Sequence, residues 1–270
     1  DFVPSRGLGD VYKRQIGVDV LIRTPREKPA RTDETEEERL AIAQKWVRRP
    51  ETYWAEGLDL AMDNKVFPIP TLPGAKRQLR LAKVRGHLRT RSEGLEHGFT
   101  KPNNKKHRGY VGPMVNVCAG IINCRVRLWE YLSKTWNGEV AASLYRGPIA
   151  KALRKWRGEK RRYHILEDND PVGYKSKKAL QAKKDVRITS IDFPKYSPDL
   201  NPLDFFLWHE VDRRMQLARV TKRETEDAYK RRLRETAMKI PAAVIRKAMV
   251  NIKVRARQLI QAKGRNIPRD

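Results

Sequence analysis

Apolar residues in the first part of the chain recur first at helical spacing and then in a strand-like run. The segment EEERLAIAQKWVRR carries apolar residues near helical spacing, and Thr35 with Glu38 three positions later predicts a capping box at its start. The following run GLDLAMDNKVF predicts a strand that ends at Asp63. The prolines and glycine of PIPTLPG then predict that regular structure stops.

Apolar residues further along mark two adjacent strands and then an alternation of helices and strands. The runs MVNVCAGII and CRVRLWEY, at 114–122 and 124–131, predict two strands joined at Asn123, because apolar and arginine residues alternate in the second run. Asn201 followed by Pro202 predicts a helix start, with a capping side chain ahead of a first-turn proline. The elements predicted between them are a helix at 139–156, a strand at 163–167, a helix at 177–184 and a strand at 186–193.

This order of elements predicts an α/β fold. Three strands come first and two later strands alternate with helices, which is typical of a mixed five-stranded sheet flanked by helices, with parallel later connections. Residues 211–270 predict one or two basic helices at the C-terminal side, with a break near Pro241.

The charge of the chain indicates a polyanionic partner. Its 59 Lys and Arg residues outnumber 32 Asp and Glu residues, which gives a formal net charge of +27. Such an excess repels itself in a compact chain, and nucleic acid is the leading candidate to neutralise it. A basic structural protein of a ribosome-like particle is the alternative that composition leaves open. Two cysteines are too few for a disulfide framework, and neither a membrane-spanning apolar run nor a signal peptide is visible.

The excess charge is concentrated in two segments. The first fifteen residues resemble a translated sequencing-adaptor remnant and are set aside, which leaves a net charge of +26. Residues 75–110, predicted as an extended excursion, carry eleven Lys and Arg against two Glu, and residues 211–270 carry eighteen against six acids. A solvated basic loop is one interpretation of 75–110, and a surface for the DNA backbone is the favoured one. The candidate DNA contacts there are Arg77, Arg80, Lys83, Arg85, Lys105, Lys106 and Arg108.

Three aspartates stand at the ends of predicted elements in this basic chain. Asp63 ends the first strand, Asp168 follows the fourth strand, and Asp204 lies in the first turn of the helix after the fifth. If the first and fourth strands are neighbours, the three carboxylates converge. Converging carboxylates repel one another unless cations compensate them, and Mg²⁺ and Mn²⁺ prefer such oxygen ligands. Two such ions about 4 Å apart can activate a water or a 3′-hydroxyl for in-line phosphoryl displacement.

Each acid has a structural alternative. Asp204 lies three positions after Asn201 and is compatible with a simple role at the helix start. The DNDP cluster is compatible with an ordinary turn, and Asp170 within it is a second candidate for the functional carboxylate. Asp59 is a second candidate on the first strand, and Glu210 is a reserve candidate on the last of these helices. The hypothesis of a metal site therefore depends on the three acids together.

Three motifs around these acids resemble one family. YSPDLNPLDFFLW, from Tyr196 to Trp208, resembles the SPDLNP-type signature of mariner-type DDE transposases of the Tc/mariner superfamily. LEDNDP at 166–171 resembles the family's second-acid motif, and LAMDNKVF at 60–67 resembles its first-acid strand. The 35 residues between the second and third acids are close to the family's usual spacing, and the resemblance covers about residues 28–215.

The resemblance implies a fold, a chemistry and partners. It implies an RNase H-like sheet in which Asp63, Asp168 and Asp204 bind two Mg²⁺ or Mn²⁺ ions. It also implies a DNA endonuclease and strand transferase that acts on transposon ends and target DNA. A homodimer on DNA follows by analogy. A nuclear location is expected, and no membrane association is expected because no apolar run is long enough to span a membrane. The implied organisation is a linker and helix at 16–50 that follow a helix-turn-helix domain missing from the chain, a catalytic domain at 51–215 and a basic helical segment at 216–270.

The sequence also departs from the family pattern. The third acid is Asp, whereas the motif SPDLNP is closer to the branch of the family that uses Glu at this position. Val172, Gly173 and Tyr174 stand where a His is common in the family. A catalytically inactive, transposase-derived nucleic-acid-binding protein is therefore the alternative to the enzyme, and a cellular RNase H-like nuclease is a third interpretation. Trp208 is expected to pack on the sheet, with stacking on a base as its alternative.

Overall fold

The computed structural model of the chain describes a central sheet, the helices around it and some short outlying strands. Side chains are described for residues 32–69, 113–133, 135–218 and 224–267. Residues 1–15 and the side chains of the seven candidate DNA contacts from Arg77 to Arg108 lie outside these ranges. The outlying backbone pairs are β1 (Leu21–Arg23) with β5 (His87–Arg89), β2 (Arg26–Lys28) with β6 (Thr100–Pro102), and β4 (Lys76–Arg77) with β7 (Tyr110–Val111).

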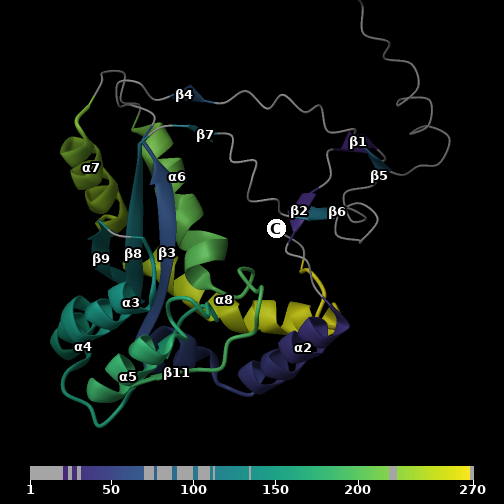
Figure 1. Cartoon of the computed structure of the whole chain (residues 1–270). Helices are drawn as coiled ribbons and strands as arrows, with labels where there is room; N and C mark the ends of the chain where they lie inside the picture. Colours follow the sequence, from purple (N-terminus) through teal and green to yellow (C-terminus); the bar gives the residue numbers. More distant parts are fainter. Residues whose placement is uncertain are drawn as a thin grey trace, which may run out of the picture.

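The central sheet has five strands in the order β11-β10-β3-β8-β9. Three antiparallel strands come first along the chain, namely β3 (Leu60–Pro68), β8 (Met114–Ile122) and β9 (Arg125–Leu132). Strand β10 (Tyr163–Leu166) pairs in parallel with β3 on one side and with β11 (Ile188–Ser190) on the other. The predicted mixed five-stranded sheet is therefore confirmed, and its first and fourth strands are neighbours (Figure 1).

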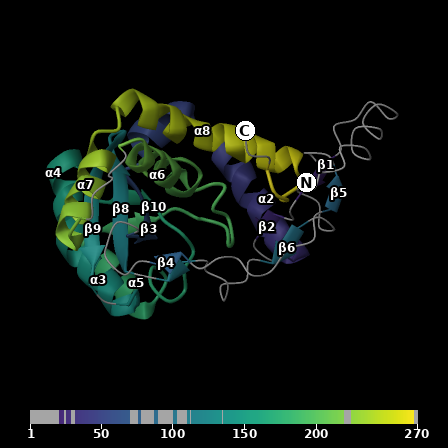
Figure 2. The same cartoon turned by 90° about the horizontal axis from the view of Figure 1, so that it is seen from above.

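Alternating strand residues face two helical layers, because neighbouring side chains of a strand point to opposite sides of a sheet. Ala61 and Phe67 belong to one core, and Leu60 and Met62 belong to the other. Figure 2 shows the sheet between α6 and α8 on one side and α3 and α5 on the other. The first layer contains the α-helices α2 (Asp33–Val47), α6 (Trp208–Leu217), α7 (Glu226–Met238) and α8 (Ala242–Gln261) and the short π-helices η1 (Tyr53–Gly57) and η5 (Leu203–Leu207). The second contains α3 (Gly138–Leu144), η4 (Tyr145–Ile149), α4 (Ala150–Arg157) and α5 (Lys177–Asp185).

Two strands differ in length from the sequence prediction. The prediction that the first strand ends at Asp63 is wrong, because β3 continues to Pro68 and stays paired with β8 throughout. The backbone pairing of β3 with the largely buried strand β8 thus outweighs the low strand preference of Asp63 and Asn64. Strand β11 is shorter than the 186–193 predicted, since its pairing with β10 is confined to Ile188–Ser190.

The predicted helices are present with changes at their ends. Helix α2 begins after Thr32, because Thr32 accepts a hydrogen bond from the Thr35 N–H and Thr35 accepts one from the Thr32 N–H. The capping box predicted for Thr35 and Glu38 therefore lies three residues earlier. The helix predicted at 139–156 is kinked at Gly147-Pro148 into α3, η4 and α4. The predicted break at Pro241 separates α7 from α8. Among the described residues, no helix combines the length and the apolar character needed to cross a membrane.

Candidate active site

The pairing of β3 with β10 determines where the first two aspartates lie. Leu166 pairs with Ala61, and both side chains belong to the core on the α6 side of the sheet. Asp168 and Asp63 each come two residues later, so they face the same layer if the alternation of side chains continues. Asp204 belongs to that layer, since it lies in η5 directly before α6. The topology thus brings the three predicted acids to one side of the sheet.

Asp63 lies in a buried aromatic environment. Only 8% of its surface is exposed, and its Oδ2 accepts a hydrogen bond from Trp208 Nε1 at 2.9 Å. Trp208 is itself buried and makes edge-on contacts with Phe67 and Trp129. The predicted packing of Trp208 on the sheet is confirmed. Its N–H additionally orients the Asp63 carboxyl, a role that the sequence pattern did not indicate.

The carboxyls of Asp63 and Asp204 lie close enough for each to affect the pKa of the other. Ionised carboxylates that lie near one another repel, so ionisation of one opposes ionisation of the next. Burial raises the pKa of Asp63, and the charge of Asp168 adds to the increase. Burial, followed by the charges of Asp63 and Asp168, also raises the pKa of Asp204. Much of Asp204 is exposed, so solvent screens part of the increase in the pKa of its carboxyl.

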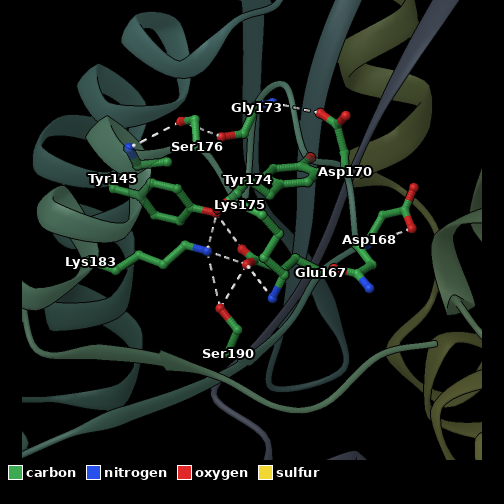
Figure 3. Close-up of polar contacts among 12 residues, drawn as sticks. Tyr145, Glu167, Asp168, Asp170, Gly173, Tyr174, Lys175, Ser176, Lys183 and Ser190 are labelled. Atoms are coloured by element: carbon green, nitrogen blue, oxygen red, sulfur yellow. Dashed lines mark hydrogen bonds and ion pairs between the residues drawn. The ribbon is translucent and has the colours of Figure 1, made fainter. Parts of the chain in front are cut away.

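Asp168 is half-buried just after the end of β10. Burial raises the pKa of its carboxyl, and the charges of Asp170 and Glu167 act in the same direction, whereas Lys175 opposes them. Its Oδ1 accepts a hydrogen bond from the Asn169 N–H at 2.6 Å (Figure 3). The three predicted acids therefore share an excess of negative charge that neighbouring lysines offset only in part.

Asp59, the alternative acid near the first strand, already has a full set of partners. It comes just before β3, four residues ahead of Asp63, and its carboxylate accepts hydrogen bonds from Arg157 Nε at 2.7 Å and Lys160 Nζ at 2.6 Å. The His164 N–H donates a third bond at 2.8 Å. Burial opposes ionisation of Asp59, but these hydrogen bonds outweigh it and hold the pKa below its usual value. Asp59 therefore ties the start of β3 to the end of α4, to the loop after it and to β10.

Asp170 and Glu210, the other competing carboxylates, also have structural partners. Asp170 accepts a hydrogen bond from Trp136 Nε1 at 2.7 Å and further bonds from two backbone N–H groups, so it closes the turn that follows β10 (Figure 3). Glu210 forms ion pairs with Arg213 and Arg214 on its own helix. The hydrogen bond from Arg213 is the main reason that its pKa falls to about 2. Glu210 is thus held within its own helix, and Asp170 is held by its own turn and by Trp136.

The turn that carries Asp204 begins at the predicted capping residue. Asn201 is buried, and its Oδ1 accepts a hydrogen bond from the Leu203 N–H at 3.1 Å, which starts η5. The predicted helix start is therefore confirmed. The charges of Asp63 and Asp168 act on the Asp204 carboxyl, so a role at the helix start does not by itself account for this residue.

The loop before Asp204 is anchored by a buried arginine that sequence patterns did not reveal. Arg39 of α2 is fully buried, and its guanidinium forms a bidentate ion pair with Asp199 at 3.0 and 2.7 Å. The same side chain donates to Ser197 Oγ and, at 2.8 Å, to the Gly264 carbonyl. The SPD part of the signature thus connects α2 and the last described residues to the loop that presents Asp204.

Replacing Asp63 by Asn is expected to stabilise the metal-free protein at neutral and alkaline pH. The folded-state pKa of Asp63 is raised above its unfolded value of about 3.9. The folded protein therefore binds the proton more tightly, and stability falls as the pH rises from the unfolded pKa through the folded one. Asn removes the buried charge and can still accept from Trp208 Nε1.

Thermal and urea unfolding in a chelator measures this effect. We expect the Asp63→Asn protein to gain about 1–3 kcal/mol at pH 8 and to match the parent near pH 3, where the carboxyl is protonated in both states. A parent that is the more stable protein at pH 8 would show that Asp63 carries no electrostatic strain.

The donor set of this site fits a hard divalent cation. Asp63, Asp168 and Asp204 offer only carboxylate oxygens, which Mg²⁺ and Mn²⁺ prefer. Burial and the charges of neighbouring acids raise the pKa of both Asp63 and Asp204, which marks a place where negative charge is under-compensated. As they stand, the described side chains include no group of three or more His, Cys, Asp and Glu arranged to hold a metal ion. An ion shared by all three aspartates therefore requires at least one of these side chains to move.

The sheet order and its flanking helices define an RNase H-like fold. The chain matches the catalytic domain of Mos1 mariner transposase with a TM-score of 0.63 and 14% identical residues, over 89% of this chain and 99% of that one. It also matches a Mos1 transposase paired-end complex with the left transposon end, at a TM-score of 0.68 and 18% identity, over 96% of this chain and 70% of that one. A Mos1 paired-end complex with Mg matches at a TM-score of 0.65.

Sequence comparison indicates the same group of proteins. The chain is 26% identical over 129 residues to the transposable element Tcb1 transposase of Caenorhabditis briggsae. The matched part is 47% of this chain and 45% of that protein, so the chain spans about half the length of this relative. No protein-family model matches the chain. The resemblance to mariner-type transposases, first indicated by three motifs, is thus confirmed in both sequence and fold.

Proposed function

We propose that this chain is the catalytic part of a DNA endonuclease and strand transferase of the mariner transposase type. The observation that carries the proposal is that Asp63, Asp168 and Asp204 come to one side of the sheet, where the charge of Asp168 raises the pKa of both other carboxyls. Like charges gathered in a partly buried place destabilise a fold unless a cation compensates them. This arrangement therefore favours a divalent-ion site over a purely structural one, and the similarity to the Mos1 and Tcb1 transposases supports it.

In this proposal, Asp63, Asp168 and Asp204 supply the ligands for two Mg²⁺ or Mn²⁺ ions. Such ions, when bound, activate an attacking water or 3′-hydroxyl and stabilise the oxygen that leaves the phosphorus. Trp208 holds Asp63 through Oδ2 and shields the base of the site from solvent. Exposure increases from Asp63 through Asp168 to Asp204, so DNA is expected to approach from the Asp204 side.

DNA is the partner that this proposal assigns, as transposon ends and as target. The basic excursion at 75–110 and the basic helices after residue 211 would neutralise phosphates, which makes binding weaken steeply with salt. The solved Mos1 structures include complexes with a transposon end and a strand transfer complex. A homodimer on DNA and a nuclear location belong to the same proposal.

Nicking of supercoiled plasmid DNA tests the proposed activity. We expect nicked product with Mg²⁺ or Mn²⁺ and none in EDTA. Salt-sensitive DNA binding without divalent-dependent cleavage would instead identify the inactive, transposase-derived binding protein. Cleavage of RNA–DNA hybrids in preference to duplex DNA would identify the RNase H-like nuclease.

A further inference from the structure

Glu167, the neighbour of Asp168 in the chain, is a fully buried carboxylate with several partners (Figure 3). Its Oε2 accepts a hydrogen bond from the Tyr145 hydroxyl, and its Oε1 accepts one from Lys183 Nζ. Ser190 Oγ donates to the same Oε1 at 2.6 Å. These contacts connect the residue after β10 with η4, α5 and β11 at once.

The charge of Glu167 is balanced inside the core. A buried carboxylate is tolerated only when cations and hydrogen bonds compensate it. The side chain of Lys183, 4% exposed, supplies the buried cation, and the more exposed Lys175 Nζ lies 3.8 Å from the same Oε1. Lys183 Nζ is held in turn by the Tyr174 carbonyl at 2.8 Å and by Ser190 Oγ at 3.1 Å. Burial lowers the pKa of Lys183, and the neighbouring Glu167 carboxylate counteracts that effect. Each member of the pair therefore depends on the other.

Glu167 and Asp168 point to different sides of the sheet. Ile165 packs into the core beside α5 and Leu166 packs into the core beside α6. The same alternation continues, because the Glu167 carboxyl contacts α5 whereas the Asp168 charge acts on Asp63 and Asp204 on the other side. The bond that Asp168 accepts from the adjacent Asn169 N–H lies within its own loop. Trp136 anchors that loop two residues further on, at Asp170, and Glu167 anchors the residue directly before Asp168.

We propose that Glu167 is a positioning residue for Asp168: its buried contacts with Lys183, Tyr145 and Ser190 fix the end of β10, so that Asp168 lies with Asp63 and Asp204. The inference rests on the proposed function, because it assumes that Asp168 binds a cation. Because Glu167 is fully buried against α5, it has no direct contact with the cation or with DNA in this proposal. Removing a group that orients a metal ligand typically weakens metal binding about 10- to 100-fold.

Glu167→Gln is the variant that tests this role. Gln keeps the shape and one acceptor oxygen but removes the charge that balances Lys183. We expect the Kd for Mn²⁺, measured by electron paramagnetic resonance on the full chain without DNA, to rise about 10- to 100-fold. In plasmid nicking, kcat should fall while KM for DNA stays near its parental value. A merely structural role would change the melting temperature but not this Mn²⁺ affinity.

Glu139→Gln is the matched control, because it makes the same chemical change in another carboxylate paired with α5. Glu139 of α3 pairs with Lys178 on the surface, and both side chains are largely exposed. We expect parental Mn²⁺ affinity and nicking from this variant. A comparable loss in both variants would overturn the assignment of Glu167.

Glu167→Gln combined with Lys183→Met separates folding from positioning. The double variant leaves no uncompensated ammonium in the core, so we expect it to recover thermal stability relative to Glu167→Gln. The anchor is still lost, so the Mn²⁺ affinity should stay low. A stable double variant with parental Mn²⁺ affinity would overturn the proposal.

Asp168→Asn, measured alongside, distinguishes this inference from the function on which it rests. If Asp168→Asn weakens Mn²⁺ binding but Glu167→Gln does not, the positioning role is wrong and the proposed metal site stands. If Asp168→Asn itself binds Mn²⁺ like the parent, the proposed function is wrong, and the positioning role that rests on it is wrong as well.

Discussion

Asp168→Asn is expected to lower the rate of divalent-dependent DNA nicking on the order of 10³-fold or more, with the fold and DNA affinity retained. Asp168 is half-buried, and an Asn oxygen can accept the same hydrogen bond from the Asn169 N–H. The substitution removes one negative charge beside Asp63 and Asp204, so a cation there loses both a ligand and much of its attraction. Single-turnover nicking of supercoiled plasmid in Mg²⁺ measures the rate, and fluorescence anisotropy in EDTA measures DNA binding.

Asp192→Asn is the control for this substitution. Its carboxylate side chain is 73% exposed and lies 3.5 Å from Lys45 on the surface. The chemical change is the same, but the predicted site is untouched, so parental nicking is expected. If Asp168→Asn also nicks at the parental rate, Asp168 has no part in catalysis.

Arg39→Met is expected to lower the free energy of unfolding by about 3–5 kcal/mol, the usual consequence of removing one partner of a buried ion pair. The Arg39 side chain is fully buried, and the Asp199 side chain that it pairs with is only 17% exposed. Met fills much of the space but donates no hydrogen bond, so the Asp199 carboxylate and the Gly264 carbonyl lose a donor. Nicking should fall as well, because the loop that leads to Asp204 loses its anchor. Urea unfolding measures the free energy.

Arg265→Met removes a second arginine from the same region of the protein. Its side chain is 72% exposed and lies 3.7 Å from Glu36, so we expect a change within about 0.5 kcal/mol. The Arg265 carbonyl, which accepts a long bond from Arg39, is unaffected by this substitution. Equal unfolding free energies for the two variants would contradict the anchoring role of Arg39.

The elements that sequence analysis predicted correctly depend on contacts between near neighbours in the chain. The strands at 114–122 and 124–131 match β8 and β9, because the first is a largely apolar run and the second shows side-chain alternation with a period of two in the sequence itself. Asn123 and Cys124 adopt positive φ angles of 51° and 53°, which the tight connection requires. The cap at Asn201 was predictable for the same reason, since it involves residues two positions apart.

The contacts that hold the acids in place could not be predicted, because their partners are remote in sequence. Trp208 and Asp63 are 145 positions apart, and Arg39 and Asp199 are 160 apart. A periodic pattern records which face of an element is buried but not which single polar group lies opposite. Glu167 was hidden for a related reason, since a carboxylate at the start of an acidic turn gives no sign of being buried.

The early end predicted for the first strand shows how local preference can mislead. Asp63 and Asn64 are poor strand formers, yet they lie inside β3 because β8 continues to pair beside them. The misplaced boundary did not move Asp63 to the wrong face, since alternation along the strand is unaffected by where the strand ends. The roles of the seven basic residues at 77–108 stay predictions.

Binding of Mn²⁺ in the absence of DNA most directly tests whether Asp63, Asp168 and Asp204 form one cation site. We predict that the parental protein binds Mn²⁺ and that an Asn at any one of the three positions weakens this binding, whereas Asp192→Asn does not. Failure of the parental protein to take up Mn²⁺, or undiminished uptake by any one of the three Asn variants, would contradict a cation site formed by all three.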